Sequence, residues 1–501
     1  MPSGLGASDV IFAGPKLNMH TNEESPAEKE LQTRQAGLSL TPFPQSLLHF
    51  IPYRLKARLA HGSVTRRVLT LAWPSVAEQT LVTLIGLVDA YIVGHLGAAA
   101  IAGVGMGGQV LNLVAALFGA IGVGATALIA RHIGAQEPEE ANRLARQAIL
   151  LAFSLGVTVA LVGWFFAEPI LASLGGAPEV VQAGSSWLRI VSPSFAFIGV
   201  LLVGNASLRG AGDTRSPLAV MVAVNLVNVA VAWIFTYGLL GAPNLGVVGT
   251  GLGAASGHIL GGVLVLILLA RGRRVLKLGF QLPAPDFARI RRILNIGLPA
   301  GAEQVLLQVA LLNLAGIIAT FGTAAYAAHS IGLRISALSF LPGWGFSVAA
   351  TTLVGQELGA RNPERAKQSA QAAFSMAFIV MLVMGVILFV FQEPILRIFT
   401  DDPAVIAAGA VVIHMSAVQQ PVLAWSFVYS GALRGAGDTR TTMLITLFSV
   451  WILRLVLAYL FGIVLGWGLF GAWLAIWVDF AFRSSMFYWR FRAGKWATLR
   501  V

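Results

Sequence analysis

The octapeptide LRGAGDTR occurs twice in the chain, at Leu208–Arg215 and again at Leu433–Arg440. Subtracting 208 from 433 gives an offset of 225, and both copies interrupt strongly apolar sequence. Two glycines and three charges in eight residues are typical of a turn between helices rather than of a buried helix. The repetition indicates that two parts of the chain are built alike.

Other short segments recur at the same offset. They pair WPSVAEQ at Trp73 with LPAGAEQ at Leu298, GAQEPEEA at Gly134 with GARNPERA at Gly359, and EPIL at Glu168 with EPIL at Glu393. Matches that keep one register over such a length are the signature of an internal repeat. We interpret the two halves as tandem copies of one unit, an arrangement that is common in transporters.

The composition is that of a membrane protein. Of the 501 residues, 56% are hydrophobic and 11% charged, with a mean hydropathy of +0.77, whereas about a quarter of the residues in soluble proteins are charged. Apolar runs of about 20 residues, long enough to cross a bilayer core, recur in both halves. We therefore predict an all-α polytopic membrane protein with twelve transmembrane helices in two six-helix lobes related by pseudo-twofold symmetry, with spans near residues 67–95, 101–131, 141–167, 179–208, 216–240, 247–270, 293–320, 324–356, 366–392, 404–433, 441–465 and 469–490.

Basic residues are distributed unevenly between the loops. They crowd the loops after spans 2, 4, 6, 8 and 10 and both termini, whereas the intervening loops hold only Arg397. The positive-inside rule therefore places the termini and the basic loops in the cytoplasm. The net charge of +12 is accordingly a topology signal, and no nucleic-acid partner is predicted. Because each half has an even number of spans, both halves insert in the same orientation, with a cleft between them.

These signals divide the chain into five parts. We predict a cytoplasmic, largely disordered tail at 1–65, an N-lobe at 66–272, a cytoplasmic linker at 273–292, a C-lobe at 293–490 and a cytoplasmic tail at 491–501. The first segment lacks the apolar region of a signal peptide, and its acidic residues argue against a transit peptide.

Each octapeptide is predicted to form a cytoplasmic turn after the fourth span of its half. The glycines suit a helix C-terminus, Asp213 can cap the next helix, and the arginines lie where anionic headgroups attract them. A catalytic role for Asp213 and Asp438 is the alternative, but the turn accounts for every residue of the octapeptide.

Four acidic residues lie within the predicted spans: Glu78, Asp89, Glu303 and Asp479. A charge at membrane depth costs roughly 3 kcal/mol, so such residues are functional candidates, with a structural ion pair as the alternative. Asp89 is the strongest candidate, because the surrounding LIGLVDAYIVG disfavours an ionised carboxyl and the group could load and release a proton. Glu78 lies eleven residues earlier, about three helical turns, and is predicted to lie on the same face.

The fifth span supplies amides to this predicted proton- or cation-binding site. Asn225 and Asn228 share a helix face and could hydrogen-bond a buried carboxyl, although intramembrane asparagines also serve simply to join helices. At the offset of 225, Asp89 corresponds to Leu314 and Asn228 to Leu453. The carboxyl site is therefore predicted in the N-lobe alone.

The second half carries polar residues of its own. Arg454 lies inside a span and could neutralise Glu303 or bind an anion; we prefer simple pairing, because a lone charge is costly. Candidates for lining a substrate cleft are Gln79, Glu303, Gln304, Gln308, Asn313, Gln420 and Tyr429. Each of these side chains could instead make a hydrogen bond between packed helices.

Enzyme chemistry has no support in the sequence. The chain has no cysteine, and its histidines at 95, 258, 329 and 414 lack metal-ligand spacing, so no metal site and no cofactor are predicted. No Walker sequence and no nucleophile–base pairing occur either. ATP-driven transport by this chain alone is therefore not expected.

Several of these sequences together resemble one known family. LVDAYIVGHLG in the first span, WLRIVSP in the fourth, the paired LRGAGDTR turns and GLPAGAEQ in the seventh span look like the multidrug and toxic compound extrusion (MATE) family, over roughly residues 66–490. The resemblance implies two six-helix lobes around a V-shaped cleft and export of organic cations or drugs against a proton or sodium gradient.

The resemblance also places functional residues of the family on this chain. The first-helix aspartate falls on Asp89 and the fifth-helix asparagine on Asn228. Ala232 stands where some members have a further aspartate, and Leu307 or Gln308 and Leu423 stand where sodium-coupled members carry acids. These departures favour coupling through Asp89, and protons over sodium.

We therefore expect a monomeric plasma-membrane antiporter that exports cationic or amphipathic small molecules by alternating access, with membrane lipids around it. Two alternatives stay open. A lipid-linked sugar flippase would need a cationic cleft, for which Arg189, Arg334 and Arg454 are candidates. A membrane scaffold or receptor that transports nothing would not need a lone buried carboxyl.

Overall fold

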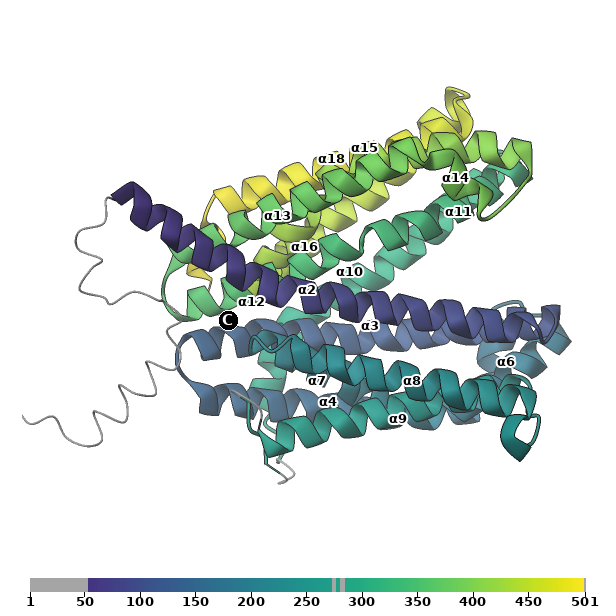
Figure 1. The fold of residues 1–501 in the computed structure, drawn as a ribbon, viewed down its shortest axis with the longest axis horizontal. Coiled ribbons are helices and arrows are strands. Elements are labelled where there is room, and N and C mark those ends of the chain that lie inside the picture. The colour runs from purple at the N-terminus through teal and green to yellow at the C-terminus, as the bar shows by residue number, and fades with distance from the viewer. Residues whose placement is uncertain (1–52, 273–275, 280–283, 500–501) are drawn as a thin grey trace, which may run out of the picture. The chain divides into compact units, whose positions relative to one another are not determined.

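The computed structural model describes residues 53–272, 276–279 and 284–499, and helices dominate this part of the chain (Figure 1). The first half contains α2 (Tyr53–Gly94), α3 (Ala98–Gly134), α4 (Pro138–Phe165), α5 (Ala167–Ser173), α6 (Pro178–Val191), η2 (Ser192–Ser194), α7 (Phe195–Gly210), α8 (Arg215–Tyr237), η3 (Leu239–Gly241) and α9 (Val247–Arg271). The second half contains α10 (Phe287–Ala319), α11 (Thr323–Ser339), α12 (Leu341–Gly359), α13 (Pro363–Val390), α14 (Gln392–Arg397), α15 (Pro403–Gly435), α16 (Thr439–Leu447), η4 (Phe448–Arg454), α17 (Leu455–Tyr459), η5 (Leu460–Val464), α18 (Gly468–Arg492) and η6 (Lys495–Thr498).

Every predicted span coincides with one of these helices or with a consecutive group of them. Within the described residues, ten helical segments are long and apolar enough to cross a membrane, and α11 with α12, bent by 42°, makes an eleventh. The twelfth is α18, a helix of 25 residues that carries more charge than a usual span because it holds a buried ion-pair cluster. The predicted all-α fold of twelve helices in two lobes is confirmed.

The predicted boundaries differ from the structure mainly at the ends. Residues 1–52 of the predicted N-terminal tail lie outside the described residues, and α2 begins at Tyr53, upstream of the predicted start of the first span. The end of the predicted linker belongs to α10, which begins at Phe287. In the C-terminal tail, Trp496 is fully buried and its indole N–H donates to the Phe491 carbonyl at 2.6 Å.

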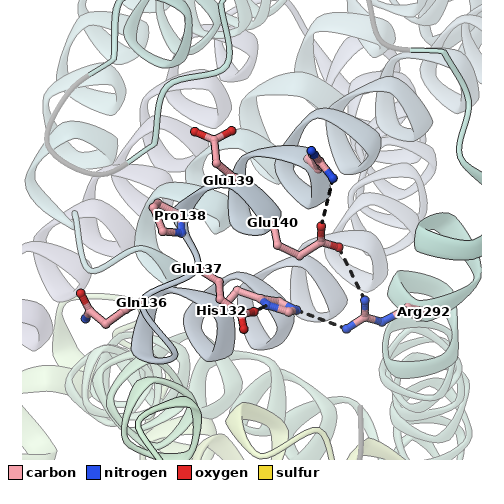
Figure 2. A pocket seen from close by; sticks show the side chains of 8 residues that line it. His132, Gln136, Glu137, Pro138, Glu139, Glu140 and Arg292 are labelled. Atoms are coloured by element: carbon pink, nitrogen blue, oxygen red, sulfur yellow. Dashed lines mark hydrogen bonds and ion pairs between the residues drawn. The ribbon is translucent and has the colours of Figure 1, made fainter.

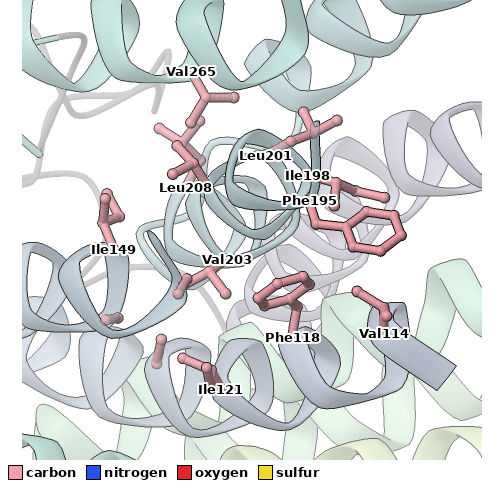
Figure 3. Packing of buried hydrophobic residues seen from close by; sticks show 14 of the residues in the cluster. Val114, Phe118, Ile121, Ile149, Phe195, Ile198, Leu201, Val203, Leu208 and Val265 are labelled. Carbon is pink, nitrogen blue, oxygen red and sulfur yellow. The ribbon is translucent and has the colours of Figure 1, made fainter. Parts of the chain in front are cut away.

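In the N-lobe, α7 is the central helix. Figure 3 shows its apolar side chains between those of α3, α4 and α9, with Phe195 of α7 next to Phe118 of α3. Both phenylalanines are fully buried. Because lipid is as apolar as these side chains, close packing rather than the hydrophobic effect holds such helices together. The buried α7 gives the octapeptide that follows it a rigid support.

The two octapeptides adopt the same turn. Gly212 and Gly437 have φ values of +87° and +86°, a left-handed conformation that glycine adopts without a steric penalty. The backbone N–H groups of Asp213 and Asp438 donate back to the carbonyls of Leu208 and Leu433 at 2.9 and 2.8 Å, as in a helix-ending Schellman turn. The predicted turn is confirmed in both copies.

The Asp213 side chain also caps the following helix, as predicted. Its Oδ1 accepts from the backbone N–H of Arg215 at 3.2 Å and of Ser216 at 3.1 Å, and its Oδ2 accepts from the Ser216 hydroxyl at 2.7 Å. Asp438 instead accepts from the Thr441 hydroxyl and the Arg490 guanidinium. The turn is thus repeated, while the partners of its aspartate differ between the lobes.

The lobes meet through α3, which packs against α10 and α12. At the crossing of α3 and α12, Gly134 lies against the Gln356 carbonyl and Gly359 against the Arg131 carbonyl. Both pairs of positions differ by 225, so the crossing obeys the pseudo-twofold symmetry. It lies at the end of the helices where residues 135–137, 211–214, 276–279, 284–286, 360–362 and 436–438 lie, which we call the basic-loop end.

Candidate functional site

Asp89 lies in α2 with part of its carboxyl group uncompensated. The side chain is half-buried, and its Oδ1 is buried with no hydrogen-bond partner among the described residues. Asn228 of α8 provides a side-chain hydrogen bond to the carboxyl, while the Asn228 Oδ1 likewise lacks a partner in the described chain. The structure therefore brings together the two residues predicted to form the core of the site.

Asn225 joins the same two helices but does not reach Asp89. Its Nδ2 donates to the backbone carbonyl of Leu81 on α2 at 2.8 Å. Further along, the Tyr237 hydroxyl donates to the Ile92 carbonyl at 3.0 Å. These two bonds hold α8 against α2 on either side of the Asp89–Asn228 contact, which makes Asn225 a residue that positions the site.

Glu78 is not part of this contact. Its Oε1 accepts from Arg209 Nη1 at 2.7 Å and from Asn205 Nδ2 at 3.4 Å, so the carboxylate faces α7. Eleven residues of helix separate it from Asp89, about 16 Å along the axis. The prediction that both carboxyls serve one site is not supported by this placement.

The C-lobe repeats the Glu78–Arg209 pair. Glu303 Oε1 accepts from Arg434 Nη2 at 2.8 Å and from the Thr446 hydroxyl at 2.9 Å. Glu303 follows Glu78, and Arg434 follows Arg209, by 225 positions. The first arginine of each octapeptide thus binds the glutamate in the first helix of its own lobe. This pairing was missed from the sequence, although the shared offset of both partners was a signal for it.

The predicted partner of Arg454 was wrong. Arg454 binds Asp479 through Nε at 3.0 Å and through Nη2, and Arg483 joins the same carboxylate at 2.9 Å. The Ser449 hydroxyl donates to the other oxygen of Asp479. Glu303 is paired with Arg434 and is therefore not available to Arg454. Arg454 and Arg483 instead form ion pairs with Asp479, and the sequence analysis did not predict either pair.

The remaining cleft candidates fall into two groups. Gln420 is fully buried and donates to the Ser339 hydroxyl at 2.6 Å, and Tyr429 is buried among the rings of Phe374, Tyr488 and Phe491. Together with Glu303, these two residues are packed inside the C-lobe and do not line a cleft. The exposed candidates are Gln304, Gln308 and Asn313 of α10, with Gln79 of α2 half-buried.

A charged hollow lies at the basic-loop end (Figure 2). His132 Nδ1 lies 2.7 Å from Glu137 Oε2, and its Nε2 lies 3.2 Å from Arg292 Nη2. Arg292 also lies 3.8 Å from Glu140. These contacts connect α3 and α4 of the N-lobe to the start of α10, so we assign the hollow to the interface between the lobes.

Asp286 fixes the start of α10 beside this hollow. Its carboxylate accepts from the backbone N–H groups of Ala288 and Arg289. The bond from the Arg289 backbone, together with the Arg289 guanidinium, lowers the pKa of Asp286. The carboxylate cap therefore stays ionised to a lower pH than an ordinary aspartate would. Among the described residues, no group of three or more His, Asp or Glu side chains is placed to hold a metal ion.

The comparison with known proteins agrees with the duplicated helical fold. The MatE family model matches residues 74–234 and 299–460, one segment in each half. The chain belongs to the MATE family. Its members are transporters rather than enzymes, and this chain is a multi-pass membrane transporter.

Individual MATE proteins are similar over most of the chain. The probable multidrug resistance protein NorM of Thermotoga maritima is 32% identical over 436 residues, which cover 86% of this chain and 93% of that protein. An outward-facing structure of a multidrug resistance MATE transporter superposes with a TM-score of 0.81 at 25% identity, covering 86% of this chain and 97% of the other. A crystal structure of MATE in the bent conformation gives 0.80 at 25% identity, with coverages of 87% and 98%.

Proposed function

We propose that this MATE protein is a secondary active exporter of cationic or amphipathic small molecules, including drugs, driven by inward flow of protons in preference to sodium. The multidrug resistance names of its relatives support the substrate class. The observation that carries the proposed coupling is the buried Asp89 Oδ1, which has no hydrogen-bond partner in the part of the chain that the structure describes. A lone carboxylate at membrane depth costs roughly 3 kcal/mol, which binding of a cation relieves.

A proton fits this position better than a sodium ion. A proton needs one carboxyl oxygen, whereas a hard metal cation is held by several oxygen ligands. The position four residues after Asn228, which could supply a second carboxylate, is the buried Ala232. The described contacts therefore offer Asp89 one amide neighbour and no further acid.

The contacts between the lobes support the proposed direction of transport. The hydrogen bonds and ion pairs between the halves, within the described residues, include Arg67–Glu357, Thr352 to the Arg209 carbonyl and Gln356 to the Gly210 carbonyl, all at the basic-loop end. We propose that this end is cytoplasmic and closed, so that Asp89 is accessible from outside. Proton uptake there would release substrate, and opening of the basic-loop end would return the proton to the cytoplasm.

The exposed amides of α10 are proposed to line the substrate path. Gln304 and Gln308 lie one helical turn apart, and both are exposed. Polar side chains within a span face protein or a water-filled cavity rather than lipid. Gln79 of α2 corresponds to Gln304 at the offset of 225, so each lobe contributes an amide from its first helix.

The test is export by the purified protein in liposomes with an imposed pH gradient or sodium gradient. Asp89→Asn should lower gradient-driven export by about tenfold or more, since 1.4 kcal/mol of lost driving interaction already corresponds to a factor of ten. Asp401→Asn, the same change at an exposed loop position, is the matched control. An Asp89→Asn protein that exports at the wild-type rate would show that coupling does not pass through Asp89.

A lipid-linked sugar flippase is the second candidate, and the structure weakens it. Arg454 is buried against Asp479, and Arg189 lies 3.5 Å from Glu168, which leaves Arg334 as an exposed cation. Of the three arginines considered for a diphosphate, Arg334 alone is both exposed and without an acidic partner in the described part of the chain. Competition of cationic drugs, but not of lipid diphosphates, for binding would support the drug exporter.

A further inference from the structure

The C-lobe contains a buried cluster with more positive than negative charge. Asp479 is fully buried, and Arg454 and Arg483 are 4% and 6% exposed. Both guanidinium groups bind the single carboxylate and also lie over the Phe480 ring, at 5.2 and 4.3 Å from its centroid. Two cations against one anion leave one positive charge in the cluster. The nearby Glu303–Arg434 pair is neutral in sum and does not change this balance.

The internal repeat allows the cluster in the C-lobe to be compared with the corresponding residues of the N-lobe. Two π-helical segments, η4 and η5, lie in the eleventh span, and a π-helical turn holds one more residue than an α-helical turn. The constant offset of 225 used above for Asn228 therefore holds only up to these segments, and Leu453 and Arg454, at the end of η4, occupy the region that corresponds to Asn228.

Helix contacts support this change of register. In the N-lobe, Gly249 packs against the backbone of Phe235 and Thr236; in the C-lobe, Gly471 packs against the backbone of Phe461 and Gly462. Subtracting 235 from 461 gives 226, one more than the offset of 225. Between the two glycines the difference is 222, because the preceding loop is shorter in the second half.

The same register aligns the other members of the cluster with glycines. Asp479 corresponds to Gly257 and Arg483 to Gly261, at a difference of 222. Gly257 lies against the Asn228 side chain in the N-lobe. Where the N-lobe has an amide beside Asp89, the C-lobe therefore has two guanidinium groups around its own aspartate.

We propose that Arg454 and Arg483 are resident counter-ions, which occupy in the C-lobe the place that a transported cation takes in the N-lobe. The inference rests on the proposed cation-coupled export and adds its stoichiometry. Like charges repel strongly where the dielectric constant is low, so a buried site with net positive charge disfavours a further cation. The Asp479 cluster carries two guanidinium groups against one carboxylate, whereas the described contacts of Asp89 include no basic side chain. The exporter accordingly moves one coupling cation per transport cycle, through the N-lobe alone.

Substitutions that change the net charge of the Arg454–Asp479–Arg483 cluster step by step test this proposal. The wild-type cluster carries a net charge of +1; Arg454→Gln or Arg483→Gln alone leaves a neutral pair; both together leave Asp479 uncompensated. We expect the wild type and both single variants to move one cation per substrate, measured from the gradient at which flux reverses in liposomes. The double variant should move two, and adding Asp479→Asn should return the value to one.

Two measurements need no change in the cluster and therefore do not depend on its folding. Wild-type stoichiometry should be one cation per substrate, and Asp89→Asn alone should abolish the gradient dependence completely. A wild-type stoichiometry of two, or residual gradient dependence in Asp89→Asn, would refute the single-site proposal while leaving cation-coupled export intact. A wild type that exports without any gradient dependence would refute the proposed function and the stoichiometry with it.

The excess positive charge of the cluster also makes anion binding a testable alternative to the proposal. Replacing chloride by gluconate should leave wild-type export unchanged, because the cluster is complete without a bound anion. A loss of export that chloride restores, and that Arg454→Gln removes, would identify the cluster as an anion site and overturn the proposal. An unchanged stoichiometry in a well-folded double variant would overturn it as well.

Discussion

Glu78 and Arg209 are far apart in sequence but form one ion pair, as do Glu303 and Arg434. Each pair links the first helix of a lobe to the octapeptide turn at the end of α7 or α15. A carboxylate that is bound in this way in both copies is better explained as part of the frame than as a coupling group. The asymmetric residue, Asp89, then remains as the candidate for coupling.

Breaking the N-lobe pair should destabilise the protein. Removing one partner of a buried pair costs about 3–5 kcal/mol, and the partial exposure of Arg209 (22% of the side chain) should bring Glu78→Gln to the lower end of that range or below it. We expect a lower apparent melting temperature for Glu78→Gln, measured by loss of folded protein on heating in detergent.

Two further variants separate this structural role from a coupling role. Glu78→Gln combined with Arg209→Gln should lose less stability than the sum of the single changes. Each single change leaves one uncompensated charge, whereas the double variant leaves none. The double variant should also keep gradient-driven export. A double variant that is stable but uncoupled would show that Glu78 itself carries the transported cation.

The residues of the site differ in how far the sequence revealed them. Asp89 and Asn228 could be predicted because a polar side chain inside an apolar span has few explanations. Gln420 and Tyr429 were misplaced because the face of a helix that meets another helix depends on packing angles, which single-sequence periodicity does not give in a membrane. Arg483 was overlooked because it follows the apolar part of its span.

Among the elements, α3 and α12 have the closest symmetric crossing between the lobes. Gly134 and Gly359 each lie against a carbonyl of the other helix, at Gln356 and Arg131. A side chain at either glycine would collide with backbone, which cannot move aside without separating the helices. The crossing is therefore a point at which closure of the basic-loop end can be tested.

Gly134→Val should hold this end partly open and lower export severalfold. Gly119→Val is the matched control, because Gly119 lies in the same helix with open space around it. Spin labels on cysteines at Glu139 and Glu364, exposed positions 225 residues apart, report the separation. The label distance should lengthen in Gly134→Val and not in Gly119→Val; equal distances in both would contradict the role of the crossing in closure.

For the whole molecule, the distribution of basic residues predicts which side each loop faces. The chain has no cysteine, so single cysteines can be labelled without background. Cysteine at Asp401, in a loop without excess basic charge, should react with an impermeant maleimide in intact cells. Cysteine at Glu139 should react only after permeabilisation. Reversed labelling would place the termini outside and refute the proposed orientation.

The large-scale plan was predictable because both of its signals are long-range and simple. Apolar length gave the spans, and the constant offset gave the duplication. The 42° bend between α11 and α12, where Pro342 stands in the first turn of α12, was not predicted. The contacts of α3 with α10 and α12 were not predicted either, because they depend on how small residues fit across the lobes. The partner of Arg454 was wrong because Glu303 is already paired with Arg434, while Asp479, on another span, binds Arg454.

The extra residue that a π-helical turn holds in the eleventh span also has an evolutionary meaning. In an α-helix, an insertion rotates all following side chains by about 100°, yet Gly471 keeps the packing partners that its N-lobe counterpart has. The π-helical turn absorbs the insertion locally. Because the two copies differ in length here, the difference arose after they separated. The lobes could then diverge in chemistry while they kept matching packing contacts, so that Asp89 lies in one lobe and the Arg454–Asp479–Arg483 cluster in the other.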